Sequence, residues 1–278
     1  MLKQELRNLH FFMITPHPEL ALLAIDSGVD KIMVDMEING KVERQGHLNT
    51  LISGHSIEDV YKISKVVPTE CIVVRINPLH SDSISEIEAV VKAGAGGIML
   101  PMFRSAAEVK DFLKIVDGRV RCYLLVETLG ALESYRHWIY EPGIDQIHIG
   151  LNDLQIELNS KFMFQSLVDG LLDNLCSALR ENNIQFGIGG IARFGEGLLS
   201  AELVLTEHAR LGSNWTILSR TFLRGLKDVN EIEKQMNLRD ELKLLQDEFK
   251  KQIGYNQEFL AQQHKKIKRL VDKIVSSI

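Results

Sequence analysis

Short apolar runs alternate with amphipathic segments from near the start of the chain to about residue 225, and this alternation most constrains the fold. The runs carry Ile, Val, Leu and Met at consecutive positions, which is typical of strands buried on both faces of a sheet. Eight runs are predicted to be strands: Phe11–Thr15, Lys31–Asp35, Cys71–Ile76, Gly97–Pro101, Arg121–Val126, Gln146–Ile149, Phe186–Ile191 and Trp215–Leu218.

Helices are predicted between these strands. Pro18–Ser27 begins with a proline in its first turn and is followed by Gly28, which suits a helix C-terminus. The other predicted helices are Ser83–Ala93, Ser105–Val116, Phe164–Glu181 and Gly197–Leu211. Such alternation indicates right-handed β-α-β connections and a parallel sheet. Eight units without a glycine-rich dinucleotide turn after the first strand favour the α/β class, as a (β/α)8 TIM barrel, over an open sheet.

The last part of the chain has a different character and is predicted to be a C-terminal helical extension. We therefore divide the chain into a barrel, residues 1–225, and an extension, residues 226–278. Two apolar stripes at helical spacing predict two helices: Leu238, Leu242, Leu245, Phe249 and Ile253 in the first, and Ile267, Leu270 and Ile274 in the second. The helices could pack on the barrel wall or serve as an exchanged arm in a homo-oligomer, and the pattern leaves both interpretations open.

Composition excludes several classes of partner. The chain has 32 Lys and Arg against 37 Asp and Glu, and a net charge of −5 without a basic stripe argues against nucleic acid. No apolar run reaches the roughly 18 residues of a membrane helix, and the N-terminus lacks the apolar core of a signal peptide. Cys71, Cys122 and Cys176 form no CxxC pair and are expected to be reduced thiols. We expect a cytoplasmic protein with no membrane partner.

Polar side chains follow several predicted strands at their carboxyl ends. Asp35 and Glu37 follow strand 2, Arg75 lies in strand 3, Glu127 follows strand 5 and Asp153 follows strand 6. In a barrel these ends converge on one mouth, where the active site lies. Burying unpaired charges there is costly, and a divalent cation would neutralise the carboxylates. Oxygen ligands without a Cys or His pair suggest Mg²⁺ or Mn²⁺, with Co²⁺ as an alternative.

The order of several short motifs resembles that of the HpcH/HpaI aldolase/citrate lyase family. The resemblance runs from about residue 18 to residue 160. The motifs are Gly28-Val29-Asp30, Asp35-Met36-Glu37, Val74-Arg75-Ile76-Asn77-Pro78, Ala93-Gly94-Ala95-Gly96-Gly97-Ile98-Met99-Leu100-Pro101-Met102, Val126-Glu127-Thr128 and Ile149-Gly150-Leu151-Asn152-Asp153-Leu154.

The resemblance implies roles for individual residues. Glu127 and Asp153 match the family's metal ligands, and Arg75 matches the arginine that contacts the substrate oxygen and stabilises the enolate. The backbone amides of Asn152 and Asp153 are expected to hold the substrate carboxylate, and Glu37 to lie near the water ligands of the metal.

The activity implied is that of a divalent-metal-dependent carbon–carbon lyase of the class II aldolase type. The reaction is expected to pass through a metal-bound enolate of a 2-oxo acid such as pyruvate, with an aldehyde as the second substrate.

The sequence also departs from the family. Pyruvate aldolases of this family usually carry a catalytic histidine directly after the acidic residue of strand 2, where this chain has Ile38. His47 or His55, in the long connection that follows, could replace that base, since histidine titrates near neutral pH; both could equally be surface histidines. Arg44 in the same connection could bind an acidic group of the substrate or lie in solvent.

Two other functions remain open at this point. One is a citrate-lyase-like enzyme that cleaves acyl-CoA esters, although strand 2 also lacks the second acidic residue typical of that branch. The other is a barrel that has lost catalysis and acts as a binding subunit. The missing histidine and the extended helical tail favour this last alternative, whereas Glu127, Asp153 and Arg75 argue against it.

Overall fold

The computed structural model describes residues 8–39 and 54–278. Eight strands form a closed parallel barrel in chain order, which confirms the predicted (β/α)8 fold. They are β1 (His10–Ile14), β2 (Lys31–Asp35), β3 (Ile72–Arg75), β4 (Gly97–Leu100), β5 (Arg121–Val126), β6 (Ile144–Ile149), β7 (Gln185–Ile191) and β8 (Trp215–Leu218). The chain forms two compact units, residues 12–148 and residues 1–11 with 149–278, and we describe each by itself.

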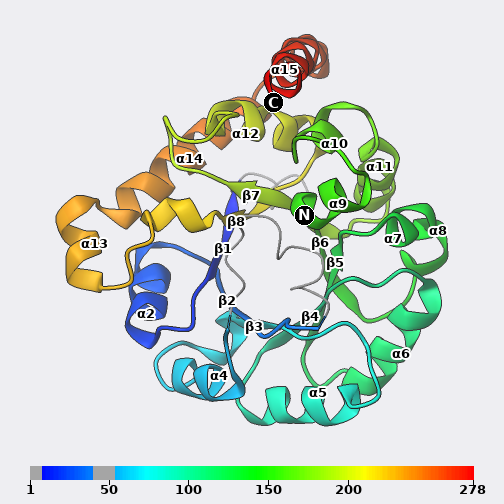
Figure 1. Cartoon of the computed structure of the whole chain (residues 1–278), viewed down its shortest axis with the longest axis vertical. Helices are drawn as coiled ribbons and strands as arrows, with labels where there is room; N and C mark the ends of the chain where they lie inside the picture. Colours follow the sequence, from blue (N-terminus) through cyan, green and yellow to red (C-terminus); the bar gives the residue numbers. More distant parts are fainter. Residues whose placement is uncertain (1–7, 40–53) are drawn as a thin grey trace. The chain divides into compact units, whose positions relative to one another are not determined.

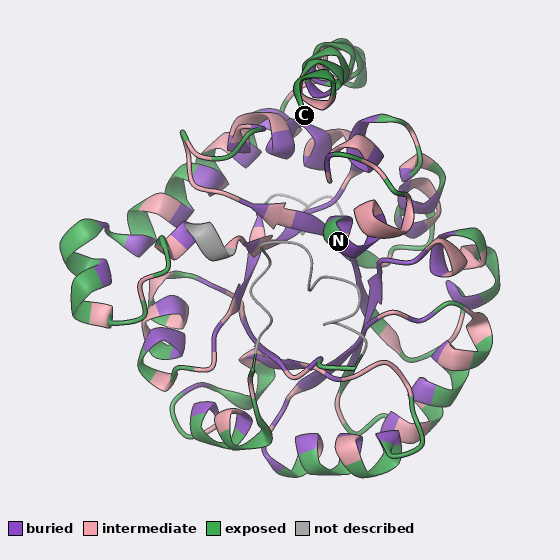
Figure 2. Cartoon of the chain, viewed as in Figure 1, coloured by how far each residue is buried: buried purple, intermediate pink, exposed green. Residues whose placement is uncertain are grey.

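In residues 12–148, helices follow the strands in turn. They are α2 (Pro18–Ser27), α4 (Ile57–Ile63), η1 (Thr69–Cys71), α5 (Ser83–Lys92), α6 (Ala106–Val116), α7 (Leu129–Glu133) and α8 (Tyr135–Trp138). Helices α2, α4, α5 and α6 lie on the outer side of the strands in this unit (Figure 1). Their strand-facing residues are buried and their outer faces exposed (Figure 2). Helix α2 ends as predicted, because Gly28 takes a left-handed φ of 109° and its N–H caps the last turn.

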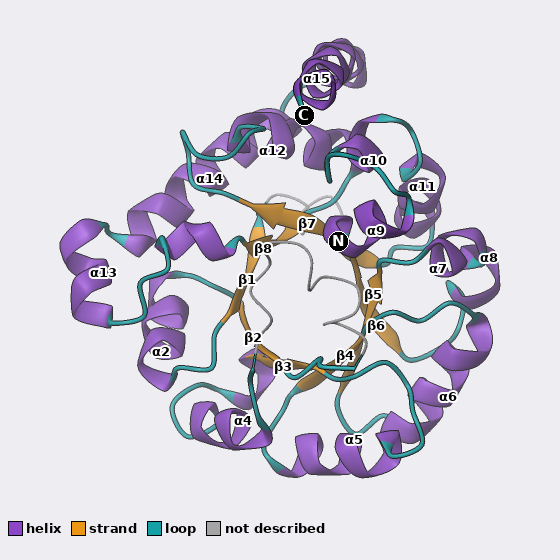
Figure 3. Cartoon of the chain, in the orientation of Figure 1, coloured by secondary structure: helices purple, strands orange, loops and turns teal. Residues whose placement is uncertain are grey.

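The second unit is mostly helical around β7 and β8 (Figure 3). Its helices are α9 (Leu151–Glu157), α10 (Gln165–Val168), α11 (Asp173–Glu181), α12 (Ala201–Leu211), η2 (Arg220–Leu223), α13 (Val229–Gln235), α14 (Leu238–Ile253) and α15 (Gln257–Ser277). Among the residues that the structure describes, no helix is both long and apolar enough to cross a membrane.

Two predicted helices of this unit have different bounds in the structure. The single helix predicted for Phe164–Glu181 is two helices, α10 and α11, separated at Gly170, whose φ of 93° interrupts the helix. The helix predicted to begin at Gly197 begins at Ala201, because Gly197 has a φ of 86° and cannot belong to a right-handed helix.

The C-terminal extension contains three helices rather than the predicted two. The extra helix, α13, ends at Gln235, because the next residue, Met236, has an extended backbone with a φ of −159°. Four residues of the first predicted stripe are buried, namely Leu238, Leu242, Leu245 and Phe249. The second stripe is partly wrong: α15 buries Leu260, Ile267 and Val271, whereas Leu270 is 39% exposed.

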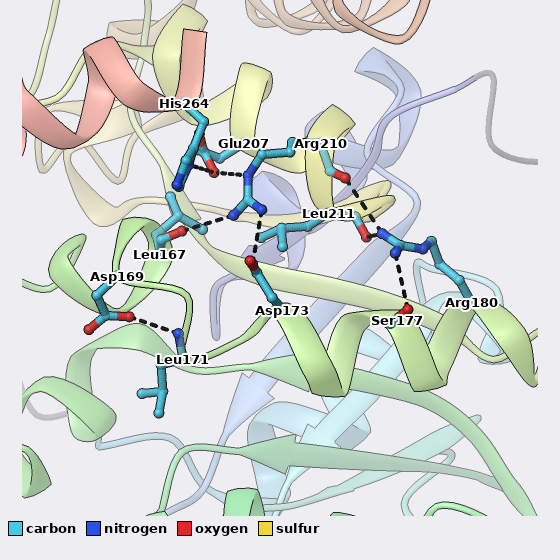
Figure 4. Close-up of polar contacts among 10 residues, drawn as sticks. All are labelled: Leu167, Asp169, Leu171, Asp173, Ser177, Arg180, Glu207, Arg210, Leu211 and His264. Carbon is cyan, nitrogen blue, oxygen red and sulfur yellow. Dashed lines mark hydrogen bonds and ion pairs between the residues drawn. The ribbon is translucent and has the colours of Figure 1, made fainter. Parts of the chain in front are cut away.

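Helices α14 and α15 pack against α12 within this unit, and α15 also contacts α10. A polar network accompanies the apolar packing (Figure 4). The fully buried carboxylate of Glu207 in α12 accepts one hydrogen bond from Arg210 Nε at 2.6 Å and lies 3.0 Å from His264 Nδ1 in α15. Arg210 also pairs with Asp173 at the start of α11, at 2.9 Å. These contacts lie within one chain, and both the division at residue 225 and a role of the extension in an oligomer stay predictions.

Candidate active site

Arg75 and Asp35 are the last residues of β3 and β2, and they face each other across the ladder between these strands. The guanidinium donates through Nε to Oδ1 at 2.8 Å and through Nη2 to Oδ2 at 2.7 Å. Asp35 is fully buried, and the side chain of Arg75 is 12% exposed. This bidentate pair fixes the plane of the guanidinium at the carboxyl ends of the strands.

Two further carboxyl groups surround the same guanidinium. Glu37 Oε2 lies 3.5 Å from Arg75 Nη1, and the side chain of Glu37 is fully buried. Burial by itself favours the neutral form of Arg75, but Asp35 above all, and then Glu37 and Glu127, outweigh it and raise the pKa of the guanidinium above its usual value. Three buried carboxyl groups thus lie around one guanidinium.

Glu127 follows β5 and is held against the loop after β4. Its Oε1 accepts a hydrogen bond from the backbone N–H of Met102 at 3.1 Å, and Met102 takes a left-handed φ of 55°. The next residue, Thr128, caps α7 by accepting from the Ala131 N–H, and it donates to the Phe103 carbonyl at 2.6 Å. These contacts hold a carboxylate that is only 2% exposed in one orientation.

The residue at the position of the family histidine, Ile38, is 54% exposed. Its backbone N–H and that of Asn39 both donate to Asn77 Oδ1 at 2.9 Å. Glu86 in turn accepts from Asn77 Nδ2 at 2.7 Å. The segment after β2 is therefore attached to the segment after β3 by one asparagine.

His55 lies beside the end of β2. Its Nδ1 accepts the backbone N–H of Asp35 at 2.9 Å. An accepting Nδ1 carries no proton, so a neutral His55 carries its proton on Nε2. The imidazole of His55 is thus hydrogen-bonded to the backbone of Asp35, whose side chain binds Arg75.

Asn152 and Asp153 belong to the other unit, in the first turn of α9. Gly150 is the N-cap and has no side chain with which to cap the turn. Asp153 is 7% exposed, whereas Asn152 is exposed. The N–H groups of a first helical turn lack partners within the helix, which makes this turn suited to a carboxylate ligand.

The structure brings Arg75, Glu37 and Glu127 together within residues 12–148, as expected for one site. Arg44 and His47 lie outside the described residues. No group of three or more His, Cys, Asp or Glu residues with the geometry of a metal site occurs in residues 8–39 and 54–278. The pairing of Asp35 with Arg75 was not predicted from the sequence, although two charged residues that end neighbouring strands could have indicated it.

Comparison with known proteins places the chain among aldolases and citrate lyases. The model of the HpcH/HpaI aldolase/citrate lyase family matches residues 8–163, more than half of the chain. No curated protein sequence gives a significant match.

Three solved structures illustrate the structural similarity. An HpcH/HpaI aldolase from Desulfitobacterium hafniense has a TM-score of 0.60 at 14% identity, covering 84% of this chain and 92% of that one. A citrate lyase from Burkholderia xenovorans has a TM-score of 0.62 at 12% identity, covering 86% and 76%. The protein CitE from Mycobacterium tuberculosis, solved with magnesium and pyruvate, has a TM-score of 0.60 at 14% identity, covering 86% and 99%. At these identities the likeness shows the fold.

Proposed function

The chain belongs to the HpcH/HpaI aldolase/citrate lyase family, and we propose that it is a divalent-metal-dependent lyase that makes or breaks a carbon–carbon bond through the enolate of a 2-oxo acid. The observation that carries this proposal is the Arg75 cluster. One guanidinium, fixed by Asp35, lies among three buried carboxyl groups at strand ends. A similar fold binds magnesium and pyruvate in CitE from Mycobacterium tuberculosis, which supports the choice of ligands.

The donor set suits a hard divalent cation. Glu127 and Asp153 are both buried carboxylates, and oxygen donors of this kind favour Mg²⁺ or Mn²⁺, with Co²⁺ as an alternative. The excess of carboxyl groups around Arg75 also favours a second positive charge. We assign Glu127 and Asp153 as the ligands and Glu37 as a neighbour of the metal's water ligands. The cation would supply Lewis-acid polarisation of the 2-oxo group.

The protein's own groups account for the rest of the chemistry. Arg75 donates to the 2-oxo oxygen, whose negative charge grows as the enolate forms, and Asp35 keeps the guanidinium in place for that contact. The amides of Asn152 and Asp153 orient the substrate carboxylate, and Arg44 is a candidate for binding an acidic group on the partner substrate.

In the cleavage direction, an aldol hydroxyl loses its proton to a base and the adjacent carbon–carbon bond breaks. The electron pair of that bond becomes the enolate, and the aldehyde leaves. Ile38 cannot accept a proton, so we assign the base to His55 or His47. The proton taken from the hydroxyl can then return to the enolate carbon, which balances the reaction.

Release of pyruvate from oxaloacetate tests the proposal, because decarboxylation passes through the same enolate and needs no base for an aldol hydroxyl. We expect release that depends on Mg²⁺ or Mn²⁺ and falls at least a hundredfold in Glu127→Gln. Glu133→Gln, which changes an exposed carboxylate of α7, is the matched control and should keep full activity. No release with any of the three metals would reject the 2-oxo acid substrate.

The citrate-lyase-like branch, which cleaves acyl-CoA esters, is the second candidate. Ile38 in place of the aldolase histidine argues against the aldolase branch, although strand 2 also lacks the second acidic residue typical of the CoA-ester branch. Release of free CoA from malyl-CoA or citramalyl-CoA, in the absence of pyruvate release from oxaloacetate, would identify this branch. A chain that binds no metal and turns over neither class of substrate would instead be a binding subunit.

A further inference from the structure

The second unit contains a cavity of about 940 Å³ that the proposed function does not use. It lies between the end of α12, the end of α11 and the turn that joins α14 to α15. Residues 212 and 213 in its wall lead directly into β8, so the cavity is at the amino end of that strand. Candidate catalytic residues of barrels follow the carboxyl ends of strands instead.

The charged residues of the wall are all basic. Arg180, Arg210 and Lys250 line the cavity together with His208, and no Asp or Glu is among its lining residues. Arg210 is neutralised by Glu207 and Asp173 (Figure 4). Arg180 and Lys250 form ion pairs with no carboxylate in the described part of the chain. Two lining cations without a counter-ion, Arg180 from α11 and Lys250 from α14, therefore favour an anionic ligand.

Arg180 is held in place before any ligand binds. Its Nη1 donates to the carbonyl oxygens of Leu211, at 2.5 Å, and Arg210, at 3.5 Å, and its Nη2 lies 3.5 Å from Ser177 Oγ. Its stem lies against Gly212, where an added Cβ would come within 2.5 Å of Arg180 Cδ. All three acceptors are uncharged, so they position the guanidinium without cancelling its charge. These contacts use three of its five N–H donors.

The cavity lining also includes apolar residues, most of them from α14 and the turn after it. Phe249 and Leu260 are buried at this position, and Ile253 and Tyr255 are half-buried. The ring of Tyr255 lies 4.1 Å from that of Phe259, which limits its movement. A cavity lined both by cations and by aromatic and aliphatic groups, in the size range of metabolite sites, suits a ligand that carries an anionic group and an apolar portion.

We propose that this cavity binds a small organic anion in which a phosphate or carboxylate group is joined to an aromatic or aliphatic portion. Arg180 and Lys250 bind the anionic group, and the wall formed by Phe249, Ile253 and Tyr255 covers the apolar portion. This second site is separate from the proposed lyase site and does not depend on it.

Calorimetric titration of the full chain with 1-naphthyl phosphate tests the proposal. We expect one ligand per chain, with binding that weakens as salt concentration rises. Inorganic phosphate, which has no apolar portion, and 1-naphthol, which has no charge, should each bind at least tenfold more weakly. Titration with 1-naphthoate shows whether a carboxylate can replace the phosphate. Equal binding of 1-naphthol and 1-naphthyl phosphate, or no binding of either, would overturn the proposal.

Substitutions then locate the binding. Arg180→Gln and Lys250→Gln should each weaken 1-naphthyl phosphate about tenfold, and the exposed Lys250 can be replaced with little risk to folding. Arg119→Gln is a matched control, because Arg119 also donates to carbonyls at the end of a helix, those of Ile115 and Val116. Glu127→Gln should leave binding unchanged. Equal weakening by Arg119→Gln, or loss of binding in Glu127→Gln, would contradict the assigned site.

Discussion

The carboxylate of Asp35 accepts two hydrogen bonds, of 2.8 Å and 2.7 Å, from the guanidinium of Arg75. The two residues are the last of the neighbouring strands β2 and β3. Because the same guanidinium lies near Glu37 and Glu127, this pair fixes a positive charge among three buried carboxyl groups. The proposed chemistry requires this charge at a defined position. Loss of the buried Asp35–Arg75 pair should therefore lower both the stability of the barrel and its activity.

Replacing Asp35 by Asn should lower both stability and activity. The substitution leaves a buried guanidinium without its main counter-charge, and we expect the free energy of unfolding to fall by about 3 kcal/mol. Urea denaturation measures this change. Glu58→Gln, in the exposed pair with Lys62, should cost no more than about 0.5 kcal/mol. Equal stability of the two variants would show that the Asp35–Arg75 pair contributes little.

Replacing His55 by Asn should separate proton transfer from enolate stabilisation. The Asn carbonyl can still accept the Asp35 N–H, as Nδ1 does in the native protein, but it cannot carry a proton. If His55 is the base, exchange of the pyruvate methyl protons with deuterated solvent should fall about a hundredfold, while pyruvate release from oxaloacetate changes only a few-fold. Proton NMR follows the exchange. Full exchange in His55→Asn combined with its loss in His47→Asn would assign the base to His47 instead.

The thiol of Cys176 should make stability depend on pH in the alkaline range. Burial raises the pKa of this thiol from 9.0 to about 12. The folded state therefore keeps the proton between pH 9 and pH 12 while the unfolded chain loses it. The free energy of unfolding should fall as pH rises through this range. Below pH 9 the thiol is protonated in both states, so the stability is at its full value there.

Denaturation of the native chain and Cys176→Ala at pH 7.5 and pH 10 isolates this effect. The native chain should lose about 1 kcal/mol more than the variant on going to pH 10. Cys71→Ala should reduce this loss of stability less than Cys176→Ala does. Burial raises the pKa of the half-buried Cys71 thiol, but the nearby Lys31 lowers it. Identical losses in the native chain and Cys176→Ala would contradict the assignment.

The barrel could be predicted from the sequence because most of its strands are runs of consecutive apolar residues, which are typical of strands buried on both faces of a sheet. Lys31–Asp35 and Arg121–Val126 agree with β2 and β5 at both ends. Breaks inside helical patterns were harder to predict. Gly170 interrupts one predicted helix through a left-handed φ, and glycine also occurs within helices, so its presence alone does not determine a break.

The candidate site was predictable in its members but not in its contacts. Arg75, Glu37 and Glu127 could be proposed because they are charged residues at or after the ends of apolar runs. Burying such charges costs free energy unless they share a partner. The attachment of His55 to the Asp35 backbone depends on the path of a long connection, and no periodicity encodes that path. In the extension, the exposure of Leu270 depends on which face of α15 meets α12, and the neighbouring Val271 is buried instead.

Titration with Mn²⁺, followed by electron paramagnetic resonance, tests most directly whether Glu127 and Asp153 hold a divalent metal that binds a 2-oxo acid. We predict one Mn²⁺ per chain, bound more tightly when pyruvate is present, and at least tenfold weaker binding in Glu127→Gln and in Asp153→Asn. Glu133→Gln should bind as the native chain does. Native Mn²⁺ affinity in both Glu127→Gln and Asp153→Asn, or no effect of pyruvate on the affinity of the native chain, would contradict the account.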